Sequence, residues 1–127
     1  MIQKQTWLNL ADSSSVLWIK TFNLYGGFFR KISTSGFYIK GAVRIIKPQF
    51  LFYKGYNFKK FKKGGIRKTL IIRDSVNTLH LSLIFLYKNN SAVLIKKKNI
   101  LLSKHLIGPS SKKIKNKKIL SLFKFIF

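Results

Sequence analysis

The residues GFYIKGAVRII, from Gly36 to Ile46, give the clearest indication of the class of fold. Ile39 and Val43 fall on one side of an extended chain here, whereas Lys40 and Arg44 fall on the other. Alternation with a period of two is typical of a β-strand that has one buried face and one solvent-facing surface. We therefore expect a strand over Gly36–Ile46 whose outer face is basic.

Other segments with strand character lie on both sides of this stretch. They are short, rich in aliphatic and aromatic residues, and separated by polar or glycine-containing turns such as Asn89-Asn90. The segments are Gln5–Leu10 and Val16–Leu24 before it, and Leu70–Ile72, Leu81–Tyr87 and Ala92–Ile95 after it. Such spacing indicates a mostly β fold, in which five or more strands close a small antiparallel barrel.

The pattern changes after Gly108-Pro109. Ser110-Ser111 precede a lysine-rich stretch with spaced isoleucines, and a hydroxyl side chain is a frequent N-cap of a helix. We expect one or two short helices there. Because the chain shows no internal repeat and no linker, we expect a single domain over residues 1–127, with the barrel in 1–109 and short helices and a tail in 110–127.

The charge balance is extreme. The chain has 26 Lys plus Arg but 2 acidic residues, which gives a formal net charge of +24 at pH 7. Mutual repulsion must oppose compaction, and closely spaced phosphates would relieve it. Hydrophobic residues make up 46% of the chain, too many for a disordered basic tail. We therefore expect a folded domain that binds a polyanion, with nucleic acid fitting better than an anionic membrane.

Catalytic and metal sites are not expected. The chain has no cysteine, and its two histidines and two aspartates are too few and too scattered for a metal ligand set or a catalytic constellation. Asp12 is instead expected to bond to the backbone of the turn after the first strand. The longest apolar runs fall well short of a membrane span. We expect no enzyme activity, no cofactor, no small-molecule substrate and no membrane insertion.

The residue composition indicates the base composition of the gene. Phe, Ile, Leu, Lys, Asn and Tyr dominate, and these residues have A/T-rich codons. The first twenty residues contain no Arg, unlike the Arg-rich presequence of an imported mitochondrial protein. We therefore expect an organelle-encoded protein, with an A/T-rich parasite or endosymbiont as the alternative.

Several short motifs together resemble a known family. At the N-terminus they are Met1-Ile2-Gln3, Gln5-Thr6, Leu8, Ala11-Asp12, Ser14, Gly26-Gly27, Arg30-Lys31, Gly36, Ile39-Lys40, Pro48 and Lys54-Gly55, without a gap. Near the C-terminus they are Ser103–Pro109, Lys112–Lys115 and Lys118–Leu122. The chain resembles the universal large-subunit ribosomal protein L-fourteen family, in its bacterial and organellar form, as a divergent mitochondrial member.

The resemblance implies a fold and partners. The fold is a five-stranded antiparallel β-barrel with a short C-terminal helical part, and matching Lys68–Arg73 to the family requires an insertion near residues 56–65. The implied partners are large-subunit rRNA, neighbouring large-subunit proteins, and small-subunit rRNA across an intersubunit bridge. The implied place is the mitochondrial ribosome in the matrix, where the protein would take part in translation.

Cationic side chains are the expected rRNA-binding residues, because long cationic side chains on a rigid scaffold can follow a phosphate backbone. They are Arg30, Lys31, Lys40, Arg44, Lys54, Lys59, Lys60, Lys62, Lys63, Arg67, Lys96, Lys97, Lys98, Lys112, Lys113 and Lys115. By the resemblance, Lys104 and His105 stand where the family faces the subunit interface.

Aromatic residues interleave with the lysines of the inserted stretch at Tyr56, Phe58 and Phe61. They could stack on bases or only seat the insertion, and the sequence favours neither interpretation.

Two other function classes remain open. A free-standing single-strand-binding barrel would bind unstructured strands without ribosomes. A cationic membrane-surface protein would need a sustained amphipathic helix, which the Lys- and Phe-containing tail lacks.

Overall fold

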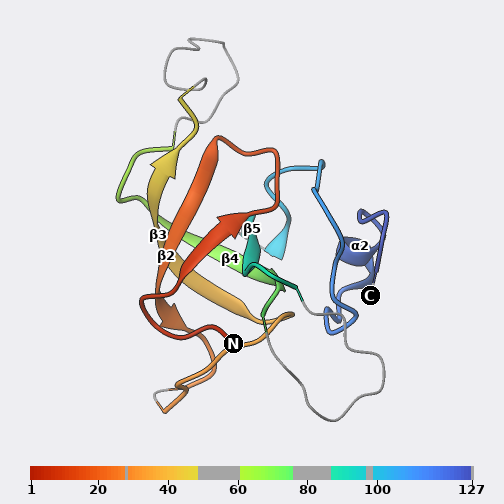
Figure 1. Cartoon of the computed structure of the whole chain (residues 1–127), viewed down its shortest axis with the longest axis horizontal. Coiled ribbons are helices and arrows are strands. Elements are labelled where there is room, and N and C mark those ends of the chain that lie inside the picture. The colour runs from red at the N-terminus through yellow and green to blue at the C-terminus, as the bar shows by residue number, and fades with distance from the viewer. Residues whose placement is uncertain (28, 49–60, 76–86, 97–98, 127) are drawn as a thin grey trace.

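The structure, a computed structural model, describes residues 1–27, 29–48, 61–75, 87–96 and 99–126. Its elements, in chain order, are β1 (Trp7–Leu10), β2 (Val16–Leu24), β3 (Tyr38–Ile46), β4 (Ile66–Arg73), β5 (Ser91–Ile95) and α2 (Lys117–Leu120). Figure 1 shows the strands wrapped around one another, with α2 and the C-terminal segment lying against one side. The expected mostly β fold with little helix is confirmed.

The five strands form a closed barrel in the order β1-β2-β3-β4-β5. Each strand pairs antiparallel with the next along the chain, while β1 and β5 close the barrel in parallel, with Asn9 opposite Ser91 and Leu10 opposite Ala92. Parallel closure follows from the odd number of strands, because strands that alternate in direction must bring two of the same direction together when the fifth meets the first.

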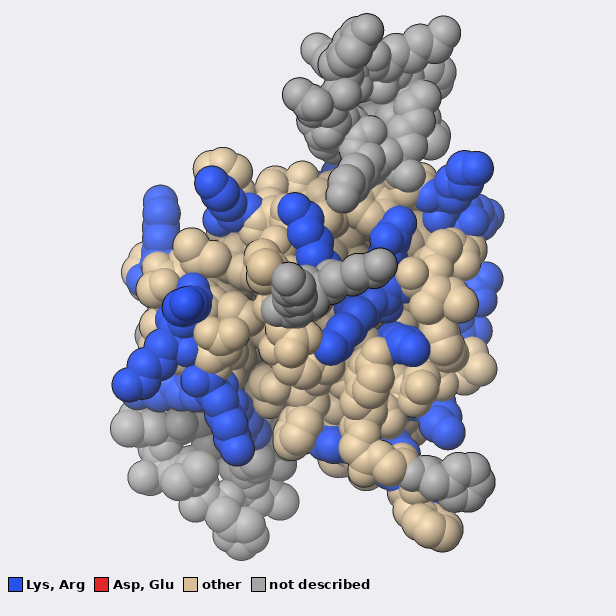
Figure 2. Space-filling view, turned by 180° about the vertical axis from the view of Figure 1, so that it is seen from behind, with Lys and Arg blue, Asp and Glu red and all other residues tan. Residues whose placement is uncertain are grey.

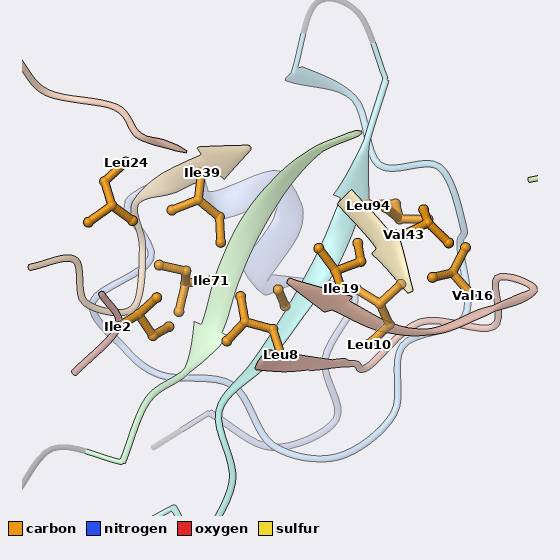
Figure 3. Packing of buried hydrophobic residues seen from close by; sticks show 11 residues of the cluster. Ile2, Leu8, Leu10, Val16, Ile19, Leu24, Ile39, Val43, Ile71 and Leu94 are labelled. Carbon is orange, nitrogen blue, oxygen red and sulfur yellow. The ribbon is translucent and has the colours of Figure 1, made fainter. Parts of the chain in front are cut away.

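The barrel interior is filled by aliphatic side chains from every strand (Figure 3). On β3, Ile39 and Val43 are fully buried, as their alternation predicts, whereas Arg44 is exposed. Ile45 departs from the alternation and is 45% exposed. The β2–β3 register shifts beside it, between the pairs that Val16 and Trp18 make, and such irregularities rotate side chains out of the regular pattern.

A second apolar cluster lies outside the barrel. The C-terminal segment places Ile114, Ile119 and Phe123 against the outer face of β4 and β5, where Ile72 and Val93 are fully buried. Both faces of β5 are thereby covered, and all five of its residues are buried. The C-terminal segment is thus a second layer of the fold.

The ends of several elements differ from the expectation. β1 begins at Trp7 because Gln5 has a φ of 73° and Thr6 closes a turn onto Gln3, which interrupts the extended chain. The predicted cap at Ser110-Ser111 is wrong. Both serines are buried and open no helix, and α2 is capped by Asn116, whose side chain accepts from the Lys118 amide.

Some predictions fall on residues outside the described part. The strand predicted at Leu81–Tyr87 lies there except for Tyr87, and so do residues 56–60 of the expected insertion.

The predicted turn contact of Asp12 is confirmed, and the carboxylate does more. Oδ1 accepts from the Ser14 amide at 3.2 Å and the Ser14 hydroxyl at 2.5 Å, while Oδ2 accepts from the Leu94 amide at 2.9 Å. Because Leu94 lies on β5, Asp12 continues the parallel β1–β5 pairing by a side chain after β1 has ended. The place where β1 and β5 close the barrel, called the barrel seam below, is therefore extended by this buried carboxylate.

Candidate nucleic-acid interface

The outer surface carries no acidic side chain. Asp12 and Asp74 are the chain's two acidic residues, and they are 2% and 6% exposed. Figure 2 shows one face of the molecule with Lys and Arg side chains spread across it and no acidic side chain in view. Folding therefore removes both carboxylates from the surface and leaves cations on it. Such a surface attracts polyanions over a wide area.

Most predicted rRNA-binding residues in the described part are exposed. The exposed ones are Lys31, Arg44, Lys62, Lys63, Arg67, Lys96, Lys112, Lys113 and Lys115. Arg30 and Lys40 are half-buried. Lys54, Lys59, Lys60, Lys97 and Lys98 lie outside the described residues. The exposed cations come from different elements and do not form one compact cluster.

Arg30 is engaged within the protein. Its Nε donates to the Ile32 carbonyl at 3.1 Å, its Nη1 donates to the Tyr25 carbonyl at 3.2 Å, and its guanidinium carbon lies 3.9 Å from the centre of the Phe37 ring. These contacts organise the loop between β2 and β3. Two of the five N–H donors of the guanidinium are used in this way, and the others can still bind a phosphate.

Lys40 lies in a group of cations and aromatic rings on the outer face of β3 and β4. Its backbone partner on β4 is Lys68, and both ammonium groups lie over the ring of Tyr25, at 5.6 and 5.4 Å from the ring centre. Lys68 also lies 4.5 Å from the ring centre of Tyr38 and donates to the side chain of Asn99 at 2.7 Å. Cations at such distances interact favourably with a ring face.

Lys62 and Lys63 stand at one end of the barrel. They belong to a turn before β4, which the Gly65 amide closes onto the Lys62 carbonyl at 3.1 Å, and the Gly64 amide donates to the Val43 carbonyl of β3 at 2.8 Å. Arg67 follows, with its guanidinium carbon 4.9 Å from the centre of the Phe61 ring, and Phe61 packs against the barrel core. Phe61 therefore seats this part of the expected insertion, while the adjacent cations face solvent.

The C-terminal segment presents another group of cations. Lys113 and Lys115 flank Ile114, whose burial in the outer apolar cluster holds the two lysines at the surface. Both line an open cavity of about 570 Å³ whose walls include Phe37 and Tyr38. This cavity lies beside the β3 end of the Lys40 and Lys68 group, so cations of the barrel and of the C-terminal segment border one surface.

Lys104 and His105 are exposed on a segment that runs beside the end of β1. The His105 carbonyl accepts from the Ser13 amide at 3.2 Å, and the Ile107 amide donates to the Ala11 carbonyl at 2.8 Å. The backbone is thus fixed while both side chains point away from the barrel core. This arrangement suits a contact with another molecule.

Arg73 makes hydrogen bonds within the protein that join β4 to the segment before the C-terminal layer. Its Nη1 donates to the carbonyls of Ile107 and Pro109, at 2.9 and 2.8 Å. Burial lowers the pKa of its guanidinium, and the nearby Tyr87 opposes that shift. Burial likewise raises the pKa of the Tyr87 phenol, with Arg73 opposing and Asp74 adding to the shift. A guanidinium engaged with two backbone carbonyls is a poor candidate for binding phosphate.

Sequence reasoning missed Lys68, Tyr25 and Tyr38. Lys68 lies just before the apolar run at Leu70 and its importance depends on facing Lys40, a pairing that no local pattern shows. Among the described residues, no three His, Asp or Glu side chains gather as metal ligands, and no helix is long and apolar enough to cross a membrane.

Comparisons with known proteins agree with the geometry. The family described as ribosomal protein L14p/L23e matches residues 1–127. The chain is 31% identical over 124 residues to large ribosomal subunit protein uL14 of Carsonella ruddii (strain PV), covering 96% of this chain and 93% of that protein. It is 32% identical over 123 residues to large ribosomal subunit protein uL14m of Tetrahymena pyriformis, covering 97% of each. The chain therefore belongs to the ribosomal protein L14p/L23e family and is a structural, non-enzymatic constituent of the large ribosomal subunit.

Proposed function

We propose that the protein is held on large-subunit rRNA by the cations of β3, β4, the turn before β4 and the C-terminal segment, and that it fixes the conformation of that rRNA. The observation that carries the proposal is the burial of both acidic side chains, which leaves a surface whose charged side chains are all cationic. At a net charge of +24, the cationic side chains repel one another, and bound phosphates neutralise this repulsion. Binding to rRNA thus supplies stability that the free protein lacks.

The group at Lys40, Lys68 and Tyr25 and the cations of Lys113 and Lys115 are the strongest candidates for rRNA contact. The strand-borne pair is held by backbone register and aromatic rings, and the second pair by the buried Ile114 between them. Lysines at backbone positions fixed in this way lose less conformational entropy on binding than lysines on a mobile segment do. Lys31, Arg44, Lys62 and Lys63 would add electrostatic attraction with less defined geometry.

Lys104 and His105 would face the small subunit. Their segment is fixed to the end of β1, and its cationic and imidazole side chains are exposed, as a bridge to small-subunit rRNA requires. Neighbouring ribosomal proteins would cover part of the remaining surface. We further propose a single domain over residues 1–127, with residues 110–127 as its outer layer.

The proposed place is the mitochondrial ribosome. The relative from Tetrahymena pyriformis carries the name of a mitochondrial ribosomal protein, and the residue bias of the chain fits an A/T-rich organellar gene. Purified mitochondria should contain the protein, and the mitochondrial DNA should contain its gene. A gene in nuclear or bacterial DNA would contradict the organellar origin.

Sedimentation tests the main proposal. In a sucrose gradient of a cell or organelle lysate at moderate salt, the protein should migrate with large subunits and with whole ribosomes. It should shift to the top of the gradient only after rRNA is digested by ribonuclease. Its presence in the ribosome-free fraction alone, while other large-subunit proteins sediment normally, would contradict the proposal.

A further inference from the structure

Lys40 and Lys68 form a pair of like charges across the β3–β4 register. They are direct backbone partners, so their Cβ atoms are about 5 Å apart on the same face of the sheet. Both are half-buried and both ammonium groups lie over the ring of Tyr25. Both ammonium groups therefore lie within 5.6 Å of the centre of one aromatic ring.

The pair has no carboxylate to neutralise it. The only acidic side chains of the chain are Asp12 and Asp74, and both are buried. Asp12 is bonded to Ser14 and Leu94 at the barrel seam. Like charges placed directly opposite each other on a sheet are destabilising. The rings of Tyr25 and Tyr38 offset part of this repulsion. An anion bound between the two lysines would neutralise the remainder.

We infer that Lys40 and Lys68 jointly hold one phosphate of large-subunit rRNA, an inference that rests on the function proposed above. Each ammonium group has three N–H donors. Lys68 gives one of them to Asn99 and keeps two. Since both groups lie over one ring, a single phosphodiester placed between them receives hydrogen bonds from both. Tyr25 is a positioning residue, because it acts by holding the two lysines.

Salt dependence of binding measures how many phosphates are held. The probe is in vitro transcribed large-subunit rRNA, titrated with the full-length protein in filter binding at a series of KCl concentrations. Each phosphate contact contributes about 0.7 to 0.9 to the slope of log K against log salt. Lys40→Gln and Lys68→Gln should each lower the slope by about one such contact. The double variant should lower it by the same amount and not by twice that amount.

A matched control removes two charges that are not paired. Lys4→Gln combined with Lys124→Gln alters exposed lysines outside the group, and the slope should change less than with either Lys40→Gln or Lys68→Gln. Tyr25→Phe keeps the ring and should bind as the wild type does, whereas Tyr25→Leu should weaken binding by several-fold. Thermal unfolding of the free protein at low salt checks folding, and Lys40→Gln should raise the melting temperature because it removes the repulsion.

The outcomes separate the inference from the proposed function. Binding of the wild type with additive losses in the double variant would show two separate phosphates and overturn the inference. Binding of the wild type with unchanged slopes in all three variants would show that the pair holds no phosphate. A lower melting temperature for Lys40→Gln would also count against an unneutralised pair. Failure of the wild type itself to bind rRNA or sediment with large subunits would instead overturn the proposed function.

Discussion

The guanidinium of Arg73, at the end of β4, lies directly against the Cα of Gly108. Its Nη1 bonds to the carbonyls of the residues on either side of that glycine, Ile107 and Pro109. Gly108 has a φ of +84°, and a Cβ there would lie 2.5 Å from Nη1. Glycine is required for the backbone conformation and also for the approach of the guanidinium. This contact fastens the C-terminal layer to the barrel.

Gly108→Ala should destabilise the protein by about 2 to 4 kcal/mol, because the strained backbone and the displaced guanidinium add to each other. The measurement is urea unfolding followed by circular dichroism. Gly64→Ala is the matched control, since Gly64 has the same φ of +84° but a Cβ there would meet nothing within 4 Å. Equal losses at the two positions would show that the contact with Arg73 adds nothing.

Arg73→Met should loosen the C-terminal layer. The carbonyls of Ile107 and Pro109 would lose a charged donor, a loss of about 1.5 to 3 kcal/mol. Limited trypsin digestion should then cut sooner after Lys112, Lys113 and Lys115, while the barrel persists. Arg67→Met alters an exposed guanidinium at the barrel end and should leave the rate of these cuts unchanged. Unchanged cleavage in Arg73→Met would mean that the apolar cluster alone holds the layer.

Asp12→Asn should cost about 2 to 3 kcal/mol of unfolding free energy, since an amide places a donor or a weaker acceptor opposite the buried Leu94 amide. Ser14→Ala removes one partner of the carboxylate and keeps the bond to Leu94, so it should cost only about 1 kcal/mol. Chemical denaturation of both variants gives the comparison. If Ser14→Ala lowers the free energy of unfolding as much as Asp12→Asn does, the stabilising contact is the one from Asp12 to Ser14 and not the one to Leu94.

Tyr87 should make the protein less stable at alkaline pH. Burial raises the pKa of its phenol in the folded state, so the folded protein holds the proton more tightly than the unfolded chain does. The contribution is fully present below the unfolded pKa of about 10 and is lost as the pH rises through the folded pKa. Tyr87→Phe should therefore gain stability relative to the wild type above about pH 10. Lysine deprotonation is common to both proteins, so a constant difference across this range would contradict the prediction.

Salt should stabilise the free protein. The net charge of +24 opposes folding, and ions screen that repulsion over about 10 Å at 0.1 M. The melting temperature should rise with KCl and rise further when KCl is replaced by polyphosphate at equal ionic strength, because polyphosphate binds the folded surface. A melting temperature independent of salt would show that the charges are too far apart in the fold to repel one another.

Much of the fold could be predicted from local pattern. Apolar patterning predicts a strand over Val16–Leu24 with the bounds that the structure has, and it predicts that Ile39 and Val43 are buried, as they are. Apolar alternation carries that information because each side chain's direction depends on its immediate neighbours. Arg44 was likewise expected on the outer face, where it lies.

The candidate site was less predictable. Alternation predicts Lys40 as a basic strand residue, but no local pattern predicts that Lys68 and Tyr25 lie beside it, because that depends on the register between strands. Arg30 was expected only as a phosphate contact, and the structure shows it holding a loop. A cation's partners are a property of the folded surface, and composition does not specify them.

Strand alternation and net charge can be read along the chain in order, and they are enough to predict a basic β-barrel with an apolar core. The burial of both carboxylates, the bond from Asp12 to β5 and the position of Lys40 and Lys68 over one tyrosine appear only in the folded molecule. These features arise where segments distant in sequence meet, and strand register and burial set them together.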